Sequence, residues 1–182
     1  YGGFNEKGFV IAITGGMSYR GEWKPGISMN LIVKWLLDQY ESTDSAVDFV
    51  QSLPHMGAFH YFIVDKDRNV ARILGTPEKI AIERFHDKTT IQTNHFLAES
   101  MKQYEDPYKI PPSSPIRYQN VEKWIARTKS TIDVEKIQEF CTTPHPKGGI
   151  HEDSEYEGIA FGTIWSWIYN FETLECLISP GN

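Results

Sequence analysis

The pattern of apolar and polar positions changes its period several times along the chain. A short apolar run, Phe9–Ile13, ends at Gly15-Gly16, which is typical of a strand buried on both faces. Apolar residues then recur at helical spacing from Asn30 to Tyr40 and from Thr43 to Leu53, which predicts two amphipathic helices. The expected inward faces are Leu31, Ile32, Trp35, Leu36 and Tyr40, then Ala46, Val47, Phe49, Val50 and Leu53.

Between Ala58 and Thr93 the period shortens to that of strands. Turn residues at Asp67-Arg68-Asn69 and Gly75-Thr76-Pro77 separate the apolar runs, so the pattern predicts an antiparallel meander. The strands expected are Phe59–Val64, Val70–Leu74 and Lys79–Glu83, with a further strand at Lys88–Gln92.

The last third of the chain begins with a loop, Tyr104–Pro115, that carries four prolines and no periodicity. Two helices follow, and a closing hairpin rich in Trp, Ile and Tyr ends the chain. The helices are marked by Val121, Trp124, Ile125 and Thr128, then by Val134, Ile137 and Phe140 after the cap candidates Thr131 and Asp133; the hairpin pairs Gly162–Asn170 with Leu174–Ser179. Helices and strands in separate runs favour an α+β fold over a parallel, doubly wound one.

Composition adds limits to this picture. A chain of 182 residues with 40% hydrophobic content suits a single domain, residues 1–182. The net charge of −6 is spread without a long like-charge block, so we expect neither nucleic acid nor an anionic membrane as partner. The chain opens on Tyr1 without an initiator Met and lacks a long apolar run, so we expect a soluble, trimmed product, cytoplasmic or secreted.

Several familiar chemistries have no support in the sequence. Cys141 and Cys176 lack CxxC spacing, and no GxSxG, HExxH, P-loop or Rossmann glycine pattern occurs. His145, His151 and Glu152 lie in a Pro/Gly loop at spacing that metal sites do not use. We therefore expect no metal and no cofactor.

Five segments follow one another along the chain: Asn5–Gly8, the hairpin begun by His60–Asp65, Thr93-Asn94, Pro111–Tyr118, and Gly162–Tyr169 with Ser179–Asn182. In sequence and in order they resemble segments of the choloylglycine hydrolases, penicillin V acylases and acyl-CoA:6-aminopenicillanic acid acyltransferases of the N-terminal nucleophile (Ntn) hydrolase superfamily. Leu74 stands where the family often has a glutamate, and His95-Phe96 replaces a common Ser-Pro. The resemblance covers nearly the whole chain.

The resemblance implies a four-layer αββα sandwich of antiparallel sheets, incomplete at its N-terminal edge. It also implies a hydrolase of linear amide C–N bonds that forms an acyl-enzyme on an N-terminal cysteine, and that cysteine is expected in a segment before Tyr1. A start at Cys141 is the less favoured alternative, because it would discard the other motifs. An acyltransferase of the same fold and a non-catalytic scaffold remain open.

The resemblance also assigns roles to single residues. Asn94 would donate its side-chain N–H to the oxyanion, and Arg117 would organise the nucleophile and lower its pKa. Gly15, Tyr19 and Tyr108 are candidate substrate-binding residues, from the segment after the first strand and from the proline-rich loop. His60 is expected to be a core histidine and not a general base, and the Trp and Tyr side chains of the closing hairpin are expected in the core.

The expected partners follow from the same reading. The substrate is a small-molecule amide. Missing front strands would leave a sheet edge uncovered, so we expect a homo-oligomer or pairing with the missing N-terminal segment.

Overall fold

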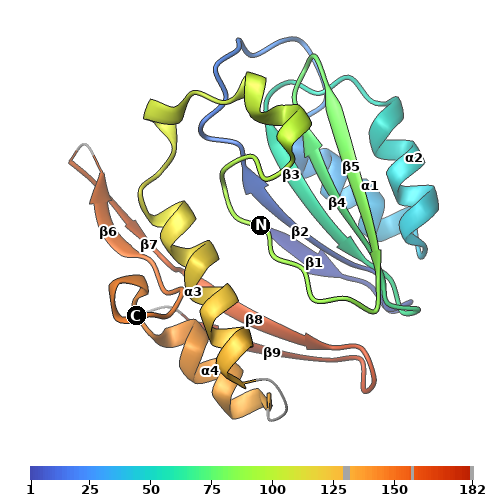
Figure 1. Cartoon of the computed structure of the whole chain (residues 1–182). Coiled ribbons are helices and arrows are strands. Elements are labelled where there is room, and N and C mark those ends of the chain that lie inside the picture. The colour runs from blue at the N-terminus through green and yellow to red at the C-terminus, as the bar shows by residue number, and fades with distance from the viewer. Residues whose placement is uncertain (129–131, 157, 181–182) are drawn as a thin grey trace. The chain divides into compact units, whose positions relative to one another are not determined.

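The computed structural model describes residues 1–128, 132–156 and 158–180 (Figure 1). These residues form two compact units, unit 1 (Tyr1–Pro111) and unit 2 (Pro112–Asn182). The predicted cap Thr131 and the family-like ending at Gly181-Asn182 lie outside the described residues. The single domain inferred from chain length stays a prediction.

Unit 1 is built on a five-stranded antiparallel sheet in the order β1-β2-β3-β4-β5 (Figure 1). Its strands are β1 (Gly2–Phe4), β2 (Val10–Gly15), β3 (Phe59–Val64), β4 (Asn69–Gly75) and β5 (Ile80–His86). The predicted meander is confirmed, and the buried first strand is also confirmed as β2. The short edge strand β1 is an addition that the sequence pattern did not indicate. Helices combined with antiparallel sheets confirm the α+β class.

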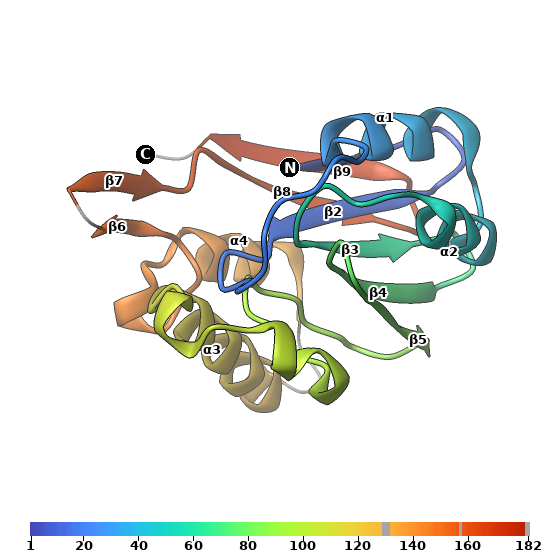
Figure 2. The ribbon, with the colours of Figure 1, turned by 90° about the horizontal axis from the view of Figure 1, so that it is seen from above.

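Two helices, α1 (Met29–Gln39) and α2 (Thr43–Ser52), lie on the same side of this sheet (Figure 2). The two helices cover one face of the sheet. Because side chains alternate between the two faces of a sheet, every second residue of a strand faces the helices. The resulting core contains, among others, Ile32, Leu36, Val47, Tyr61, Ile63 and Ile73, all at 1% exposure or less. Both predicted helices are confirmed within two residues at each end.

The predicted inward face of α1 is wrong for two residues. Leu31 is 62% exposed and Trp35 is 56% exposed, whereas Val33 is buried in their place. Helical periodicity defines an apolar stripe, but this stripe is wide, and the sheet covers only its Ile32, Val33 and Leu36 side. Leu31 and Trp35 instead line a surface cavity of about 740 Å³ together with Phe49 of α2 and other residues.

The other face of the sheet carries polar side chains at central positions. Thr14 and His60 are register partners on β2 and β3, and both alternate with residues that face the helices. Arg72 of β4 faces its register partner Glu83 of β5, with 2.6 Å between Arg72 Nη2 and Glu83 Oε2. This polar face anchors the site described below.

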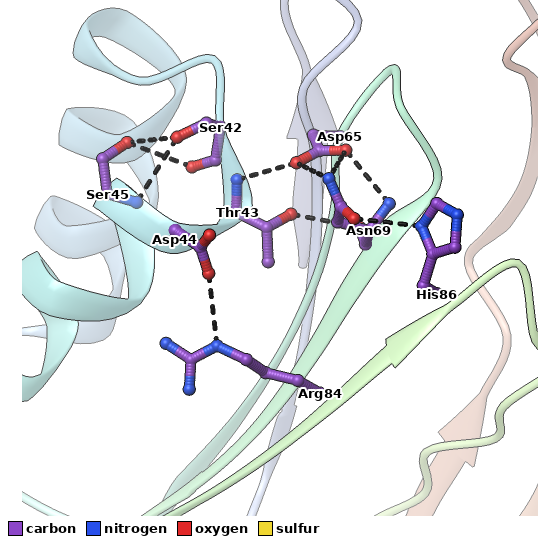
Figure 3. A network of polar contacts seen from close by, with 8 residues as sticks. All are labelled: Ser42, Thr43, Asp44, Ser45, Asp65, Asn69, Arg84 and His86. Carbon is purple, nitrogen blue, oxygen red and sulfur yellow. Dashed lines mark hydrogen bonds and ion pairs between the residues drawn. The ribbon is translucent and has the colours of Figure 1, made fainter.

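A hydrogen-bond network joins the start of α2 to the β3–β4 turn (Figure 3). The Asp65 carboxylate accepts from the backbone N–H of Thr43 at 3.0 Å and from that of Asn69 at 3.1 Å. Thr43 Oγ1 in turn donates to the Asn69 carbonyl at 3.0 Å. Burial alone would raise the pKa of Asp65, but these hydrogen bonds outweigh it and lower the pKa. Asp65, the acid at the end of the predicted strand, therefore has a structural role.

Asn5, the first residue of the Asn-Glu-Lys-Gly motif, ties the β1–β2 turn to the end of α1. Its amide donates to the carbonyls of Leu37 and Tyr40 at 3.0 and 2.8 Å, and its Oδ1 accepts from Phe9 N–H at 3.0 Å. Gly8 completes the turn with φ of 78°, a conformation that favours glycine. The contacts of Asn5 and the conformation of Gly8 thus give this motif a structural role in the β1–β2 turn.

The described residues of unit 2, 112–128, 132–156 and 158–180, form two helices, a short 3₁₀ turn and two hairpins. They are α3 (Ser113–Thr128), α4 (Val134–Thr142), η3 (His145–Lys147), β6 (Asp153–Tyr156) with β7 (Ile159–Gly162), and β8 (Trp165–Asn170) with β9 (Glu175–Pro180). Asp133 caps α4 as predicted, because its Oδ1 accepts from Lys136 N–H at 2.8 Å. The closing hairpin is confirmed, and the β6–β7 hairpin is an addition.

Two further expectations need correction. The loop predicted for Tyr104–Pro115 contains a 3₁₀ turn, η2 (Pro107–Lys109), and α3 begins inside it at Ser113. Trp165 of the closing hairpin was expected in the core but is 54% exposed, because it sits at the first position of β8 in a two-stranded ribbon. Trp167 and Tyr169 are half-buried.

Candidate functional site

The residue with the best-defined predicted role, Asn94, lies in an irregular segment that we call the Asn94 segment (residues 91–96). The strand predicted at Lys88–Gln92 is absent from the structure, and β5 ends at His86. Asp87 then adopts φ of 47°, a left-handed conformation that carries the chain out of the sheet. The β-like composition of Lys88–Gln92 is overridden by this turn.

Side chains from the polar face of the sheet hold the start of the Asn94 segment. Arg72 of β4 donates from Nη1 to the Ile91 carbonyl at 2.8 Å. Thr14 of β2 donates from Oγ1 to the Thr93 carbonyl at 3.0 Å. Nothing in the sequence pattern marks Thr14 or Arg72, because both read as ordinary alternating positions in strands.

His60 of β3 meets the same segment one residue further on. Its side chain is fully buried, its Nε2 lies 3.2 Å from the Asn94 carbonyl oxygen, and its ring packs edge-on against Phe96. Burial lowers the pKa of His60 to about 4, so the imidazole is neutral at pH 7. The expectation of a core histidine is confirmed.

The structure brings two of the predicted site residues together. Asn94 Nδ2 donates to the carbonyl of Gly15, the last residue of β2, at 3.1 Å across 79 residues of sequence. This hydrogen bond orients the side-chain amide. A fixed neutral donor of this kind suits stabilisation of an oxyanion.

Glu105 is a further residue of this region that sequence reasoning missed. It is 4% exposed, and its Oε1 accepts from Phe96 N–H at 2.8 Å and from Ser18 Oγ at 3.0 Å. Its Oε2 accepts from Lys102 Nζ at 2.8 Å. Burial alone would raise the pKa of Glu105, but these donors lower it, so the group is a charged anchor. It holds the Asn94 segment to the chain that follows Gly15.

The two segments predicted to contact substrate lie side by side in unit 1. Tyr19 and Glu105 form an antiparallel bridge, and Asp106 N–H donates to the Ser18 carbonyl at 2.6 Å. The chain after Gly15 is therefore fixed against the start of the proline-rich loop.

The two candidate tyrosines are placed very differently within these segments. Tyr19 is 7% exposed, and its hydroxyl donates to Glu78 Oε2 at 2.5 Å. Burial and Glu78 raise the pKa of Tyr19. Tyr108, in η2, is 95% exposed. A substrate-binding role for Gly15, Tyr19 or Tyr108 stays a prediction.

Arg117, the second predicted catalytic residue, lies on α3 in unit 2. Its Nε is 3.3 Å from Glu152 Oε2, and the two side chains are 23% and 17% exposed. Burial lowers the pKa of Arg117, and Glu152 opposes that change. Ser154 Oγ donates to Glu152 Oε1 at 2.5 Å, and His145 Nδ1 lies 3.8 Å from the same oxygen. Arg117 and Glu152 thus form an ion pair, a contact that the sequence pattern could not indicate.

Neither cysteine of the chain is in an activating environment. Burial raises the pKa of Cys141 in α4 and of Cys176 in β9, which disfavours the reactive thiolate. Cys141 lines a small cavity of about 80 Å³ between α4 and the β8–β9 hairpin. The alternative start at Cys141 gains no support from these surroundings.

The described ranges, 1–128, 132–156 and 158–180, contain no group of three or more His, Cys, Asp or Glu side chains that could hold a metal ion. No helix in them has the length and apolar character needed to cross a membrane.

Comparison with protein families identifies a family for this chain. A protein family described as "Acyl-coenzyme A:6-aminopenicillanic acid acyl-transferase" matches residues 1–181. The search of curated proteins found no match. The family match spans the five segments on which the resemblance rests, except for the last residue, Asn182.

Proposed function

Because the chain belongs to the acyl-coenzyme A:6-aminopenicillanic acid acyl-transferase family, which is Ntn-hydrolase-like, we propose that it forms part of an enzyme that cleaves linear amide C–N bonds. The observation that carries this proposal is the contact of 3.1 Å between Asn94 Nδ2 and the Gly15 carbonyl. It holds a neutral amide donor at the end of a buried strand, where it can face a reacting carbonyl. The substrate is a small-molecule amide.

The nucleophile in this proposal is an N-terminal cysteine on a segment outside the printed sequence. Support comes from Cys141 and Cys176, because burial raises the pKa of both thiols and so works against nucleophilic use. Tyr1 has a phenol, which can supply neither the thiolate nor the acyl-thioester chemistry. No metal and no cofactor enter the reaction.

The reaction proceeds in two halves. The free α-amino group of the cysteine takes the thiol proton, and the sulfur attacks the amide carbon. The negative charge that forms on the carbonyl oxygen is stabilised by the Asn94 N–H. The C–N bond then breaks, the amine leaves with the proton, and water releases the acid from the thioester. The resemblance to the family gives Arg117 the role of orienting the nucleophile and favouring its thiolate form.

The proposed fold is the four-layer αββα sandwich, completed by strands at the N-terminal edge. In this proposal α1 and α2 form an outer layer of the sandwich and the five-stranded sheet forms the layer beneath them. Support comes from the apolar core that these two helices bury against the sheet. In this proposal the edge strand β1 pairs with the cysteine-bearing segment or with another copy of the chain.

A second candidate, an acyltransferase, is favoured by the description of the matching family. In that reaction an amine replaces water as the acceptor, and a thioester replaces the amide as the donor. The same residues serve both reactions. A non-catalytic scaffold is the remaining alternative.

The test uses the complete natural gene product, isolated with its own N-terminus and sequenced. Amine release from a panel of N-acyl amides is measured for the natural protein and for Asn94→Ala. We expect Asn94→Ala to lower kcat by about 100- to 1,000-fold, as for loss of one oxyanion donor. Offering acyl-CoA donors with amine acceptors in the same assay separates the transferase from the hydrolase.

Asn120→Ala is the matched control. Asn120 also donates its amide to backbone carbonyls, those of His145 and Gly149 at 2.8 Å each, but it belongs to unit 2 and has no proposed part in chemistry. We expect its kcat to stay within about 3-fold of the natural value, well below the loss for a catalytic donor. The natural gene product could also lack an N-terminal cysteine and turn over neither amides nor thioesters. That result would reject the enzyme and favour the non-catalytic scaffold.

A further inference from the structure

The Asn94 segment is held by side chains that come from register partners of the sheet. Thr14 and His60 stand opposite each other on β2 and β3. Thr14 donates to the carbonyl of Thr93 at 3.0 Å, and His60 approaches the carbonyl of Asn94 at 3.2 Å. The backbone carbonyls of Thr93 and Asn94 are thus both contacted by one pair of neighbouring side chains on β2 and β3. The rigid sheet, through these two side chains, sets the position of an otherwise irregular segment.

His60 is the member of this pair that touches Asn94 itself. A carbonyl oxygen can only accept, so the His60 nitrogen that faces it, Nε2, must carry the hydrogen. Nδ1 is then an acceptor, and it is buried without a hydrogen-bond partner among the described residues. An unsatisfied buried acceptor is destabilising, so folding alone would favour an apolar side chain at this position.

The surroundings of His60 leave it little freedom. Its ring packs edge-on against Phe96, with centroids 4.7 Å apart, and Phe96 N–H is held by Glu105 at 2.8 Å. On its other side Asn94 reaches the Gly15 carbonyl at 3.1 Å. Backbone and side chain of Asn94 are therefore fixed from two different strands, β3 and β2. A small displacement of the Asn94 backbone would therefore change the direction in which the Asn94 side-chain amide points.

We propose that His60 is a positioning residue: its Nε2–H, donated to the Asn94 backbone carbonyl, aims the Asn94 side-chain amide at the reacting carbonyl oxygen. This inference rests on the proposed function of Asn94 as oxyanion donor. His60 touches neither substrate nor nucleophile in it. The unpartnered Nδ1 is the structural cost of keeping a donor at this point.

The test compares substitutions at His60 in the complete natural protein. His60→Met removes the donor at similar volume, and His60→Gln restores an N–H near the position of Nε2. With an N-acyl amide substrate we expect His60→Met to lower kcat by up to about 100-fold, as for misplacement by about 1 Å, with KM nearly unchanged. His60→Gln should recover most of that loss. Thr14→Val, which is isosteric, should act in the same direction with a smaller loss.

His55→Met is the matched control. His55 is likewise buried, at 5% exposure, and its Nε2 lies 3.0 Å from a backbone carbonyl, that of Val50 in α2. Both Met variants lose one imidazole–carbonyl hydrogen bond and should unfold at lower temperature. Only the His60 variant should lose turnover beyond the loss of folded protein. Equal losses of kcat in the two variants would overturn the proposal.

A second measurement does not depend on activity. The side-chain ¹H–¹⁵N amide resonances of Asn94, identified by their loss in Asn94→Asp, should shift in His60→Met, return toward their original positions in His60→Gln, and stay in place in His55→Met. Unchanged Asn94 resonances in His60→Met would reject the positioning role. If the natural protein turns over no amide at all, the proposed function fails, and these resonances still decide whether His60 positions Asn94.

Discussion

The two compact units differ most in what they bury. Unit 1 contains two clusters of buried apolar side chains, one between the sheet and α1 and α2, and one around Phe96 and Met101. Among the side chains of unit 2 whose burial the structure describes (residues 112–128, 132–155, 158–160 and 162–180), Phe140 is the single apolar one below 9% exposure, and it stacks on Trp124. The interior of unit 2 includes the polar side chains of Ser114 and His145.

This difference indicates two ways of holding a chain together. Unit 1 satisfies the usual criterion for independent folding, which is a hydrophobic core of its own. Unit 2 is organised by helix contacts, by two hairpins of two strands each, and by the polar cluster of Arg117, Glu152 and His145. A two-stranded hairpin alone is marginally stable in water. Substitutions should therefore have large effects in unit 1 and small ones on the hairpin surface of unit 2.

The largest expected effect tests this contrast with one chemical change at two places. Ile63 in β3 is fully buried, and Ile178 in β9 is 69% exposed. Ile63→Ala should lower the free energy of unfolding by about 2–5 kcal/mol, because it leaves a cavity in a packed core. Ile178→Ala should change it by no more than about 0.5 kcal/mol. Urea denaturation followed by circular dichroism measures both.

Ile63→Val serves as the graded control and should cost about 0.5–1.5 kcal/mol. A cost for Ile178→Ala equal to that for Ile63→Ala would break the comparison. It would show that the β8–β9 hairpin has a buried face in solution.

The second expected effect is a loss of stability at acidic pH that arises from His60 in the core of unit 1. Burial lowers the pKa of His60 from 6.5 to about 4; the bond to Asn94 and the nearby Glu105 oppose this, and His95 and Arg72 add to it. Between these two values the unfolded chain binds a proton that the folded chain does not, so stability falls as the pH falls from about 6.5 to 4. The loss is on the order of 3 kcal/mol.

Urea unfolding at pH 7 and pH 4.5 measures this dependence. His60→Gln has no titrating group at the site and should lose a smaller share of its stability on acidification. His55, whose pKa is also lowered by burial, contributes in the same direction and remains in the variant as an internal reference. Identical pH dependence in His60→Gln and the natural chain would mean that His60 is not the titrating group.

The fold could be predicted from sequence where the hydrophobic period was unambiguous. The runs at Asn30–Tyr40, Thr43–Leu53 and Phe59–Val64 became α1, α2 and β3, because period and burial coincide there. Periodicity could not tell which side of the α1 stripe would face the sheet, so Trp35 was misplaced. The β6–β7 hairpin has an acidic first strand, Asp153–Tyr156, without an apolar alternation to reveal it.

The candidate site was accessible to sequence reasoning only in part. Resemblance to a family pointed to Asn94, and the structure shows what holds it. The partners of its segment are Gly15, Thr14 and His60, which are far away along the chain and are brought near by strand register. Glu105 and Glu152 are acids in irregular segments, and their roles as anchors arise from tertiary contacts that no local pattern encodes.

The smallest expected effects compare one ion pair from each unit. In unit 1, Arg84 Nε lies 3.2 Å from Asp44 Oδ1, with side chains 49% and 85% exposed (Figure 3). In unit 2, the pair of Arg117 and Glu152 is 23% and 17% exposed. Arg84→Ala should cost no more than about 1 kcal/mol, because water and salt screen an exposed pair. Glu152→Gln should cost about 1–3 kcal/mol, because it removes the negative charge of Glu152 from beside a half-buried guanidinium.

Thermal unfolding of both variants at low salt and in 1 M NaCl separates the two cases. High salt should erase most of the Arg84→Ala effect, since the Debye length falls to about 3 Å, and should leave most of the Glu152→Gln effect. If Arg84→Ala proved the costlier change, the polar cluster around Glu152 would not be what holds unit 2. The contrast between an apolar core in one unit and a polar one in the other would then lose its energetic basis.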